Sequence, residues 1–485
     1  MAEDLKSKTI SGVVWSTIER FSVQGVSFLV TIIMARILSP SDYGLIGMLS
    51  IFMSLSYVFI DGGFSDALIQ KNKNTEKDYS TVFYINLFIS IILYALLFVS
   101  APYIASFYNQ PLLCAITRVY TINLVVNSLV AVHKVKLTID LDFKTQTKIS
   151  VISAIISGIS GVWSAYSGFG VWAIVIQMIV QSVLNVVLSC YFVRWLPTKF
   201  IDKESFHRLF SFGSKLLVTK IIGNIYVNLY NLIIGKRYSS EQLGLYTRAT
   251  QFGQLLSTNL TSILTRVSFP VFCTLKDDNE FLLRSYKKYI KMTAFIMFPL
   301  VLCLIGISKP LILILLTEKW AACIPILQVV CFAYLCDGLT LINLNLLYVK
   351  GKSDLALKLE VIKKSIAVII LFISMNFGLM AICYGQVLYA FIALYINTHY
   401  TKKLLGYGRI SQLKDVLPYF VFSFIMLVLQ LITVKFVENL YLELVLSVLG
   451  GFGIYIGCCF ATRQSSLYEV IDILRARKRS FPVQQ

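Results

Sequence analysis

The chain has 485 residues, of which 57% are hydrophobic and 14% charged, and its mean hydropathy is +0.75. This composition excludes an ordinary soluble globular protein. The net charge of +19 does not indicate nucleic acid as a partner, because the basic residues fall in short segments between long apolar stretches.

The apolar stretches are continuous, which favours helices over the alternating strands of a membrane barrel. Residues 149–193 and 365–401 contain no Asp, Glu, Lys or Arg, and a glycine-containing turn divides each into two helices. The first stretch, residues 11–35, is interpreted as a retained span and not a cleaved signal peptide. We therefore expect an all-α polytopic membrane protein with about fourteen spans. They begin near Ser11, Gly44, Ser80, Leu112, Ile149, Gly170, Phe212, Leu243, Lys287, Ala321, Val361, Met380, Val416 and Leu440.

Basic residues concentrate in every second inter-span segment, such as 134–148, 276–291 and 350–364, whereas the segment at 108–110 has none. The positive-inside rule therefore predicts that both termini are cytoplasmic. It also predicts that the basic tail containing Arg475, Arg477, Lys478 and Arg479 is cytoplasmic.

Polar residues recur on helical faces at an offset of 200 residues. In the first and seventh spans the two sets are Arg20, Gln24 and Thr31, and Lys220, Asn224 and Asn231. In the second and eighth spans they are Ser50, Ser54, Tyr57 and Asp61, and Thr250, Gln254, Ser257 and Thr261. Spacings of three and four residues keep such groups on one helix face. The repeat predicts two six-helix lobes in parallel orientation, residues 1–200 and 201–405, followed by two further spans and the tail in 406–485.

Polar groups inside spans tend to face a bundle interior or a wet cavity. We therefore expect a substrate cavity lined by Arg20, Gln24, Lys220, Asn224, Arg118 and Arg248. For Arg20 the alternative is a side chain that reaches back to the lipid headgroups. The excess of intramembrane cations suits an anionic ligand, phosphate in particular, although structural ion pairs explain it equally well.

Three acidic residues, Glu19, Asp61 and Asp337, are candidates for ion coupling or charge pairing. Glu19 adjoins Arg20, and Asp61 precedes the Gly62-Gly63 pair, which invites a break in the second span. Asp61 has three interpretations: a pair with Arg20 or Lys220, cation coupling, and helix capping at the break, of which we favour capping. Asp337 is open between coupling of H+ or Na+ and a structural hydrogen bond.

Catalytic and metal-binding motifs give no support for an enzyme. The ten cysteines lie almost entirely in apolar stretches without metal-ligand spacing, and the three histidines are far apart. The sequence contains no phosphate-binding loop or nucleophile elbow. We expect no cofactor, no metal and no catalysis.

Residues 35–44 (ARILSPSDYG) and 61–70 (DGGFSDALIQ) resemble the opening of bacterial Wzx-type polysaccharide flippases. These proteins form the polysaccharide transport branch of the multidrug/oligosaccharidyl-lipid/polysaccharide (MOP) superfamily. Residues 141–144 and 348–355 are similar to the inside loops of that family, and Arg20 matches its basic position in the first span.

The resemblance implies alternating access that moves an oligosaccharide on polyprenyl pyrophosphate across the bacterial inner membrane. The product would serve lipopolysaccharide, capsule or exopolysaccharide assembly, with polysaccharide assembly proteins as further partners. Two alternatives are a drug or cation antiporter of the same superfamily and a membrane glycan polymerase.

Overall fold

The computed structural model describes residues 2–71, 74–198 and 202–480, and within these ranges the chain is helical without a β-strand. Contacts along the chain divide it into two compact units, Met1–Gly244 (unit 1) and Leu245–Gln485 (unit 2). The division falls inside a helix, because α10 runs from Ser240 to Thr274. The lobe boundaries expected from the repeat stay a prediction.

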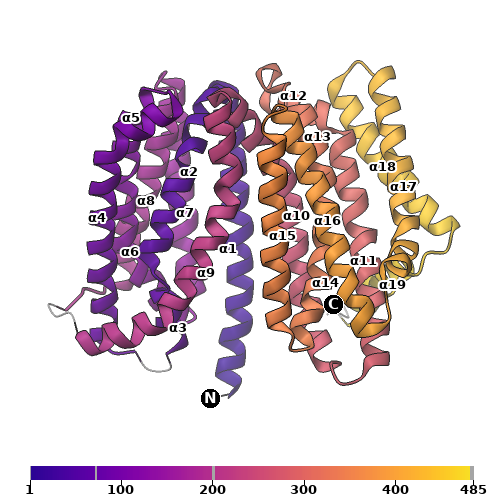
Figure 1. Ribbon diagram of the computed structural model, residues 1–485, viewed down its shortest axis with the longest axis horizontal. Coiled ribbons are helices and arrows are strands. Elements are labelled where there is room, and N and C mark those ends of the chain that lie inside the picture. The colour runs from indigo at the N-terminus through magenta and orange to yellow at the C-terminus, as the bar shows by residue number, and fades with distance from the viewer. Residues whose placement is uncertain (1, 72–73, 199–201, 481–485) are drawn as a thin grey trace, which may run out of the picture. The chain divides into compact units, whose positions relative to one another are not determined.

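Unit 1 holds the helices from the N-terminus to α9, which Figure 1 draws in indigo to magenta. They are α1 (Ala2–Ile37), α2 (Pro40–Asp61), α3 (Phe64–Gln70), α4 (Glu76–Tyr108), α5 (Leu112–Tyr120), α6 (Ile122–Ile139), α7 (Phe143–Tyr166), α8 (Val171–Val193) and α9 (Lys203–Arg237). The main packing pairs are α1 with α7, α7 with α8, α2 with α9, and α4 and α8 with α6.

Unit 2 contains most of α10 and the remaining helices, drawn in rose to yellow (Figure 1). These are α11 (Asn279–Gly306), α12 (Ser308–Leu316), the 3-10 turn η1 (Glu318–Trp320), α13 (Cys323–Tyr334), α14 (Asp337–Val349), α15 (Ser353–Ser374), α16 (Leu379–Leu405), α17 (Arg409–Phe436), α18 (Leu440–Ala461) and α19 (Ser465–Ser480). Here α11 packs on α17, α17 on α18, and α16 on α13, α14 and α15. For the basic tail, the side chains of residues 473–480 and all of 481–485 lie outside the described part of the chain.

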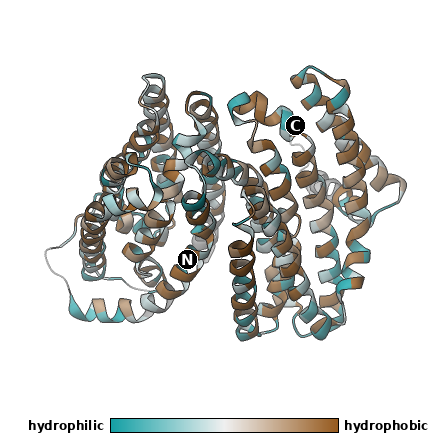
Figure 2. Cartoon of the chain, turned by 45° about the horizontal axis from the view of Figure 1, so that its top comes forward, coloured by the Kyte–Doolittle hydropathy of each residue, from teal (hydrophilic) through white to brown (hydrophobic). Residues whose placement is uncertain are grey.

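Twelve segments among the described residues are long and apolar enough to cross a membrane, which confirms the expected class of polytopic membrane protein. Figure 2 shows hydrophobic residues along the lengths of the helices and hydrophilic residues mainly near their ends. Two predicted spans are not among the twelve, although α10 has 35 residues and α15 has 22. Both helices carry charged or polar side chains along much of their length. The count of fourteen spans stays a prediction.

The second span breaks where the sequence predicted it. Gly62 and Gly63 have φ angles of 52° and 75°, in the left-handed region that glycine adopts without steric cost. Two successive residues in this conformation end α2 at Asp61 and start α3 at Phe64.

Two further breaks were not predicted. The fourth span divides at Thr121, between α5 and α6, and the tenth divides at Leu335 and Cys336, between α13 and α14. None of these three residues is a glycine or proline, so the sequence carries no local signal for either break. Their matching places in the two halves of the chain are compatible with the predicted repeat.

The starts of α2 and α10 lie against each other within unit 1. A Cβ atom on Gly44 would lie 1.7 Å from the carbonyl oxygen of Ser240, and one on Gly244 would lie 1.8 Å from that of Pro40. The Ser41 and Ser240 hydroxyls are 2.6 Å apart. Two helix starts that are about 200 residues apart in the chain are therefore neighbours in space.

Candidate functional site: a polar seam between α2 and α9

Two of the predicted polar faces meet each other in unit 1. On α9, Asn231 donates a hydrogen bond to Ser50 of α2 at 3.3 Å, and Lys220 lies 2.8 Å from Asp61 of α2. The two contacts are eleven residues apart on each helix, at positions 231 and 220 of α9 and at positions 50 and 61 of α2. The residue number falls along α9 as it rises along α2. The helices therefore run antiparallel along one continuous contact. We call Ser50, Asp61, Asp66, Lys220 and Asn231 the polar seam.

The cation of the seam is bound by two carboxylates. The Lys220 ammonium lies 2.8 Å from a carboxylate oxygen of Asp61 and 2.6 Å from one of Asp66. The two acids flank the Gly62-Gly63 break, since Asp61 ends α2 and Asp66 lies in the first turn of α3. One ammonium group therefore ties both halves of the broken span to α9.

Helix periodicity does not predict the part that Asp66 plays. On an unbroken helix a residue five positions after Asp61 would point about 140° away from it. The left-handed turn at Gly62 and Gly63 redirects the chain and brings the second carboxylate to Lys220. The Gly-Gly pair was the available signal, but it predicts a break and not the new direction.

Close backbone contact supports the ion pairs. A Cβ atom on Gly63 would lie 2.5 Å from the carbonyl oxygen of Gly213, and one on Gly213 would lie 2.6 Å from that of Gly62. Gly213 is seven residues before Lys220 and so shares its face of α9. Glycine at both positions allows α9 to approach the break closely enough for the ammonium to reach both acids.

The preference for Asp61 as a helix cap was wrong. The residue that precedes α3 is Gly63, and no side chain caps that helix. Asp61 makes the alternative contact, the pair with Lys220, because an intramembrane ammonium and carboxylate lower the cost of each other's charge. Around Lys220 there are two acids to one base, so this part of the site is not net basic as the lining was expected to be.

Other predicted residues of unit 1 lie on separate elements or make separate contacts. On α1, Arg20 is exposed and Gln24 half-buried, and Glu19 accepts a hydrogen bond of 2.6 Å from Ser150 of α7. On α9, the side-chain oxygen of Asn224 accepts a hydrogen bond of 2.9 Å from Asn228.

Arg118 lies on α5 and contacts α4. Its guanidinium carbon is 4.7 Å from the centre of the Phe98 ring, and its Nε donates to the Phe98 carbonyl at 3.5 Å. The structure therefore gives Arg118 an aromatic partner instead of bringing it to the carboxylates around Lys220.

In unit 2, Asp337 is the first residue of α14, beside the break in the tenth span. Its carboxylate accepts a hydrogen bond of 2.6 Å from Ser257 of α10, whose side chain is buried. Ser257 belongs to the polar face predicted for the eighth span, so that face meets an acid in this unit as well. The hydrogen bond fits both interpretations of Asp337 that the sequence left open.

Arg248 is buried on α10 near the same unit's η1 turn. Its Nη1 donates to Gln251 at 2.6 Å, and its guanidinium carbon lies 5.7 Å from the ring centre of the fully buried Trp320. These contacts place the cation against an aromatic side chain, which is a favourable environment for a guanidinium group.

The helices and their polar contacts define an all-α polytopic membrane protein. The family described as "Polysaccharide biosynthesis protein" matches residues 33–325, and the chain belongs to this family. The match confirms the resemblance inferred from the sequence.

Two curated relatives and one solved structure extend this finding. The chain is 27% identical over 354 residues to the teichuronic acid biosynthesis protein TuaB of Bacillus subtilis (strain 168), which covers 73% of each chain. It is 26% identical over 364 residues to the lipopolysaccharide biosynthesis protein WzxC of Escherichia coli (strain K12), covering 74% of this chain and 73% of WzxC. The lipid II flippase MurJ in an inward closed conformation matches with a TM-score of 0.74 and 16% identity, over 93% of this chain and 99% of MurJ. The chain shares the MurJ fold.

Proposed function

We propose that this protein is a flippase that carries an oligosaccharide on polyprenyl pyrophosphate across the bacterial inner membrane. It works by alternating access from the cytoplasmic to the outer leaflet, with both termini in the cytoplasm. Its product feeds the assembly of lipopolysaccharide, capsule or exopolysaccharide, together with polysaccharide assembly proteins.

Family membership over residues 33–325 is the observation that carries this proposal. The names of the relatives TuaB and WzxC concern the biosynthesis of teichuronic acid and of lipopolysaccharide, and MurJ is a lipid II flippase. A cargo common to such pathways is a glycan built on a lipid carrier. Transport of that carrier, without catalysis by this chain, accounts for a protein made of membrane helices.

The polar seam supplies a means of recognising the pyrophosphate. The Lys220 side chain is 38% exposed, so an incoming anion can reach its ammonium group. Pyrophosphate oxygens compete with Asp61 and Asp66 for this cation, because all three are anionic acceptors. Capture of Lys220 by the cargo frees the two carboxylates and loosens the tie between α9 and the broken span. Cargo binding thus favours movement of these helices.

The remaining candidates complete this scheme as proposals. Polar groups of the cargo path come from Arg20, Gln24 and Asn224. Two further cations of the path, Arg118 and Arg248, are held in place by their aromatic contacts. Asp337 is the candidate for coupling to H+ or Na+, since it is an acid at a helix break inside a span.

A cation antiporter of the same superfamily is the rival that the seam itself favours, because two carboxylates surround one ammonium group. Such an antiporter binds its cargo through the acids, whereas the flippase binds through Lys220. The two mechanisms differ in the sign of the cargo charge that the protein recognises.

The test is translocation by purified protein in proteoliposomes. A fluorescent polyprenyl-pyrophosphate oligosaccharide is incorporated in both leaflets, and a membrane-impermeant quencher reports the fraction that becomes accessible. The proposal expects bleaching of nearly all the label with protein and about half without it. Protein that leaves half of the label protected, yet exchanges an organic cation for protons, contradicts the flippase and supports the antiporter.

A further inference from the structure

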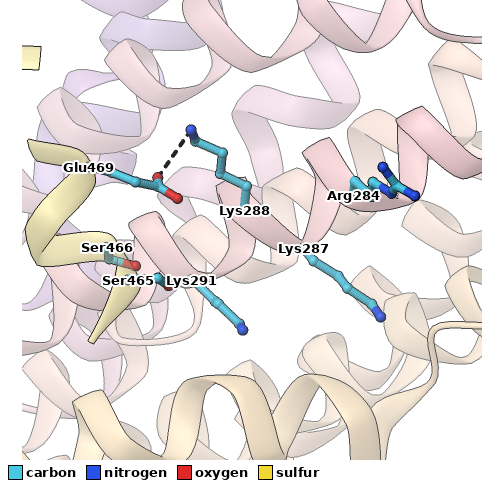
Figure 3. A pocket seen from close by; sticks show the side chains of 7 residues that line it. All are labelled: Arg284, Lys287, Lys288, Lys291, Ser465, Ser466 and Glu469. Atoms are coloured by element: carbon cyan, nitrogen blue, oxygen red, sulfur yellow. Dashed lines mark ion pairs between the residues drawn. The ribbon is translucent and has the colours of Figure 1, made fainter. Parts of the chain in front are cut away.

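A second charged site lies in unit 2 and is lined by residues other than those of the proposed transport path. It is a pocket of about 180 Å³ between the first turns of α11 and the start of α19. Figure 3 shows the side chains that line it. They are Arg284, Lys287, Lys288, Lys291, Ser465, Ser466 and Glu469.

Four cations reach this pocket from one helix. Lys287, Lys288 and Lys291 follow Arg284 by three, four and seven residues, which places the four cations within about two turns of α11. In Figure 3 the Lys287 and Lys291 side chains extend on the side of α11 away from Glu469. Like charges three or four residues apart on a helix repel one another, so this arrangement costs stability unless anions neutralise it.

The protein's own acids neutralise the pocket only in part. Arg284 pairs with Glu280 at 2.5 Å, Lys288 with Glu469 at 3.2 Å, and Lys291 with Asp415 of α17 at 3.1 Å. Lys287 lies 5.2 Å from the ring centre of Tyr407 and has no carboxylate partner in the described part of the chain. Its ammonium group is therefore available to an added anion.

The other wall is polar and held in place. Ser466 is buried, and its hydroxyl lies 2.8 Å from that of Tyr419 on α17, which fixes the first turn of α19 against α17. Ser465 lines the pocket beside it. Ser465 thus places a hydroxyl group at the volume that the cations line, while the Ser466 hydroxyl is bonded to Tyr419.

Exposed apolar side chains lie on α11 and α17, the helices that carry most of the residues in these ion pairs. Phe281, three residues before Arg284 on α11, is 57% exposed, and Ile410 and Leu413 on α17 are 73% and 60% exposed. In a polytopic membrane protein such surfaces contact acyl chains. A ligand that is anionic at one end and apolar at the other matches both the basic pocket and the exposed apolar side chains. A free phosphate ion matches the basic pocket alone.

We infer that this pocket binds the phosphate group of an anionic phospholipid headgroup, with the acyl chains along α11 and α17. Basic pockets beside membrane helices are suited to such headgroups, because each cation near an anionic lipid adds to the attraction. The site is independent of the proposed cargo path, which uses other residues.

The experiment measures lipid binding to the full-length protein in detergent by native mass spectrometry. Phosphatidylglycerol is expected to bind at least ten-fold more tightly than phosphatidylcholine. Lys287→Gln/Lys288→Gln is expected to weaken phosphatidylglycerol binding by about ten-fold. The matched control is Lys358→Gln/Lys403→Gln, which removes two exposed lysines of the same unit outside the pocket and should leave binding unchanged.

Two further variants separate binding from folding. Lys287→Arg/Lys288→Arg keeps the charge and should retain phosphatidylglycerol binding. Glu469→Gln removes the acid that competes for Lys288 and should tighten it. Equal loss in the pocket and control variants, or no gain in Glu469→Gln, would overturn the inference.

A separate arm distinguishes the two sources of phosphate. Inorganic phosphate at millimolar concentration should fail to displace phosphatidylglycerol. If inorganic phosphate binds to the wild type and is lost in Lys287→Gln/Lys288→Gln while phosphatidylglycerol shows no preference, the pocket serves a soluble anion and the lipid assignment is wrong.

Discussion

Gly44 of α2 contacts the first residue of α10, and Gly244 of α10 contacts the first residue of α2, although the two glycines are 200 residues apart. At each glycine the facing backbone leaves space for a hydrogen atom but not for a side chain. A side chain on either glycine would collide with a backbone carbonyl oxygen of the facing turn. The contact is reciprocal, because Gly44 faces Ser240 and Gly244 faces Pro40, and these two residues are themselves related by the same offset. Such reciprocity is what a two-fold relation between repeated segments produces.

This contact predicts that larger residues at the two glycines destabilise the protein. Gly44→Val or Gly244→Val should lower the free energy of unfolding by about 1–3 kcal/mol, because the added atoms force the helix starts apart. Thermal unfolding of the purified protein measures the effect. Gly223→Ala on α9 is the control, since a Cβ atom there meets nothing within 4 Å. Unfolding temperatures equal to that of the control would refute the importance of the contact.

The close approach at Gly213 predicts a functional effect. In Gly213→Ala the new Cβ atom would lie 2.6 Å from the Gly62 carbonyl oxygen, so α9 must shift away from the break. The shift separates Lys220 from its acids, and translocation should fall by about ten-fold. The proteoliposome assay measures this rate, again with Gly223→Ala as the control. Wild-type translocation by Gly213→Ala would show that the close approach is not needed.

Asp337 and Ser257 allow the coupling proposal to be separated from a structural role. Asp337→Asn keeps an oxygen that can accept the Ser257 hydrogen bond but removes the ionisable carboxyl group. Ser257→Ala removes the hydrogen bond and keeps the carboxyl group. If Asp337 couples transport to H+ or Na+, only Asp337→Asn should lose the dependence of translocation on an imposed ion gradient. The same response in both variants would assign Asp337 a structural hydrogen bond.

Sequence periodicity predicted much of this architecture because it depends on local regularities. The spacing of Lys220 and Asn231 placed them on one helix face, and the structure turns that face to the predicted face of α2. The glycine pair predicted the break after Asp61, since two glycines in succession favour left-handed backbone.

What the sequence could not predict depends on direction and on tertiary contacts. The second partner of Lys220, Asp66, follows from the path of the chain after the break. The divisions at Thr121 and Leu335 arise in residues without helix-breaking character. Periodicity placed Arg118 inside a span but did not reveal that it packs on Phe98.

In the proposed transport cycle, Lys220 exchanges its carboxylate partners for the pyrophosphate of the cargo. Lys220→Ala removes the cation and leaves Asp61 and Asp66 without their shared partner. Lys236→Ala is the matched control, because Lys236 is an exposed cation on the same helix that contacts Phe107 instead. The double variant Lys220→Asp/Asp61→Lys keeps one cation and two acids at the junction, with the charges exchanged between α2 and α9.

The most direct test is the initial rate of translocation of the labelled lipid-linked oligosaccharide in proteoliposomes containing each of these proteins. We expect a loss of at least about ten-fold in Lys220→Ala, a near-normal rate in Lys236→Ala and partial recovery in the double variant. A rate in Lys220→Ala equal to that of the wild type would contradict the proposed exchange.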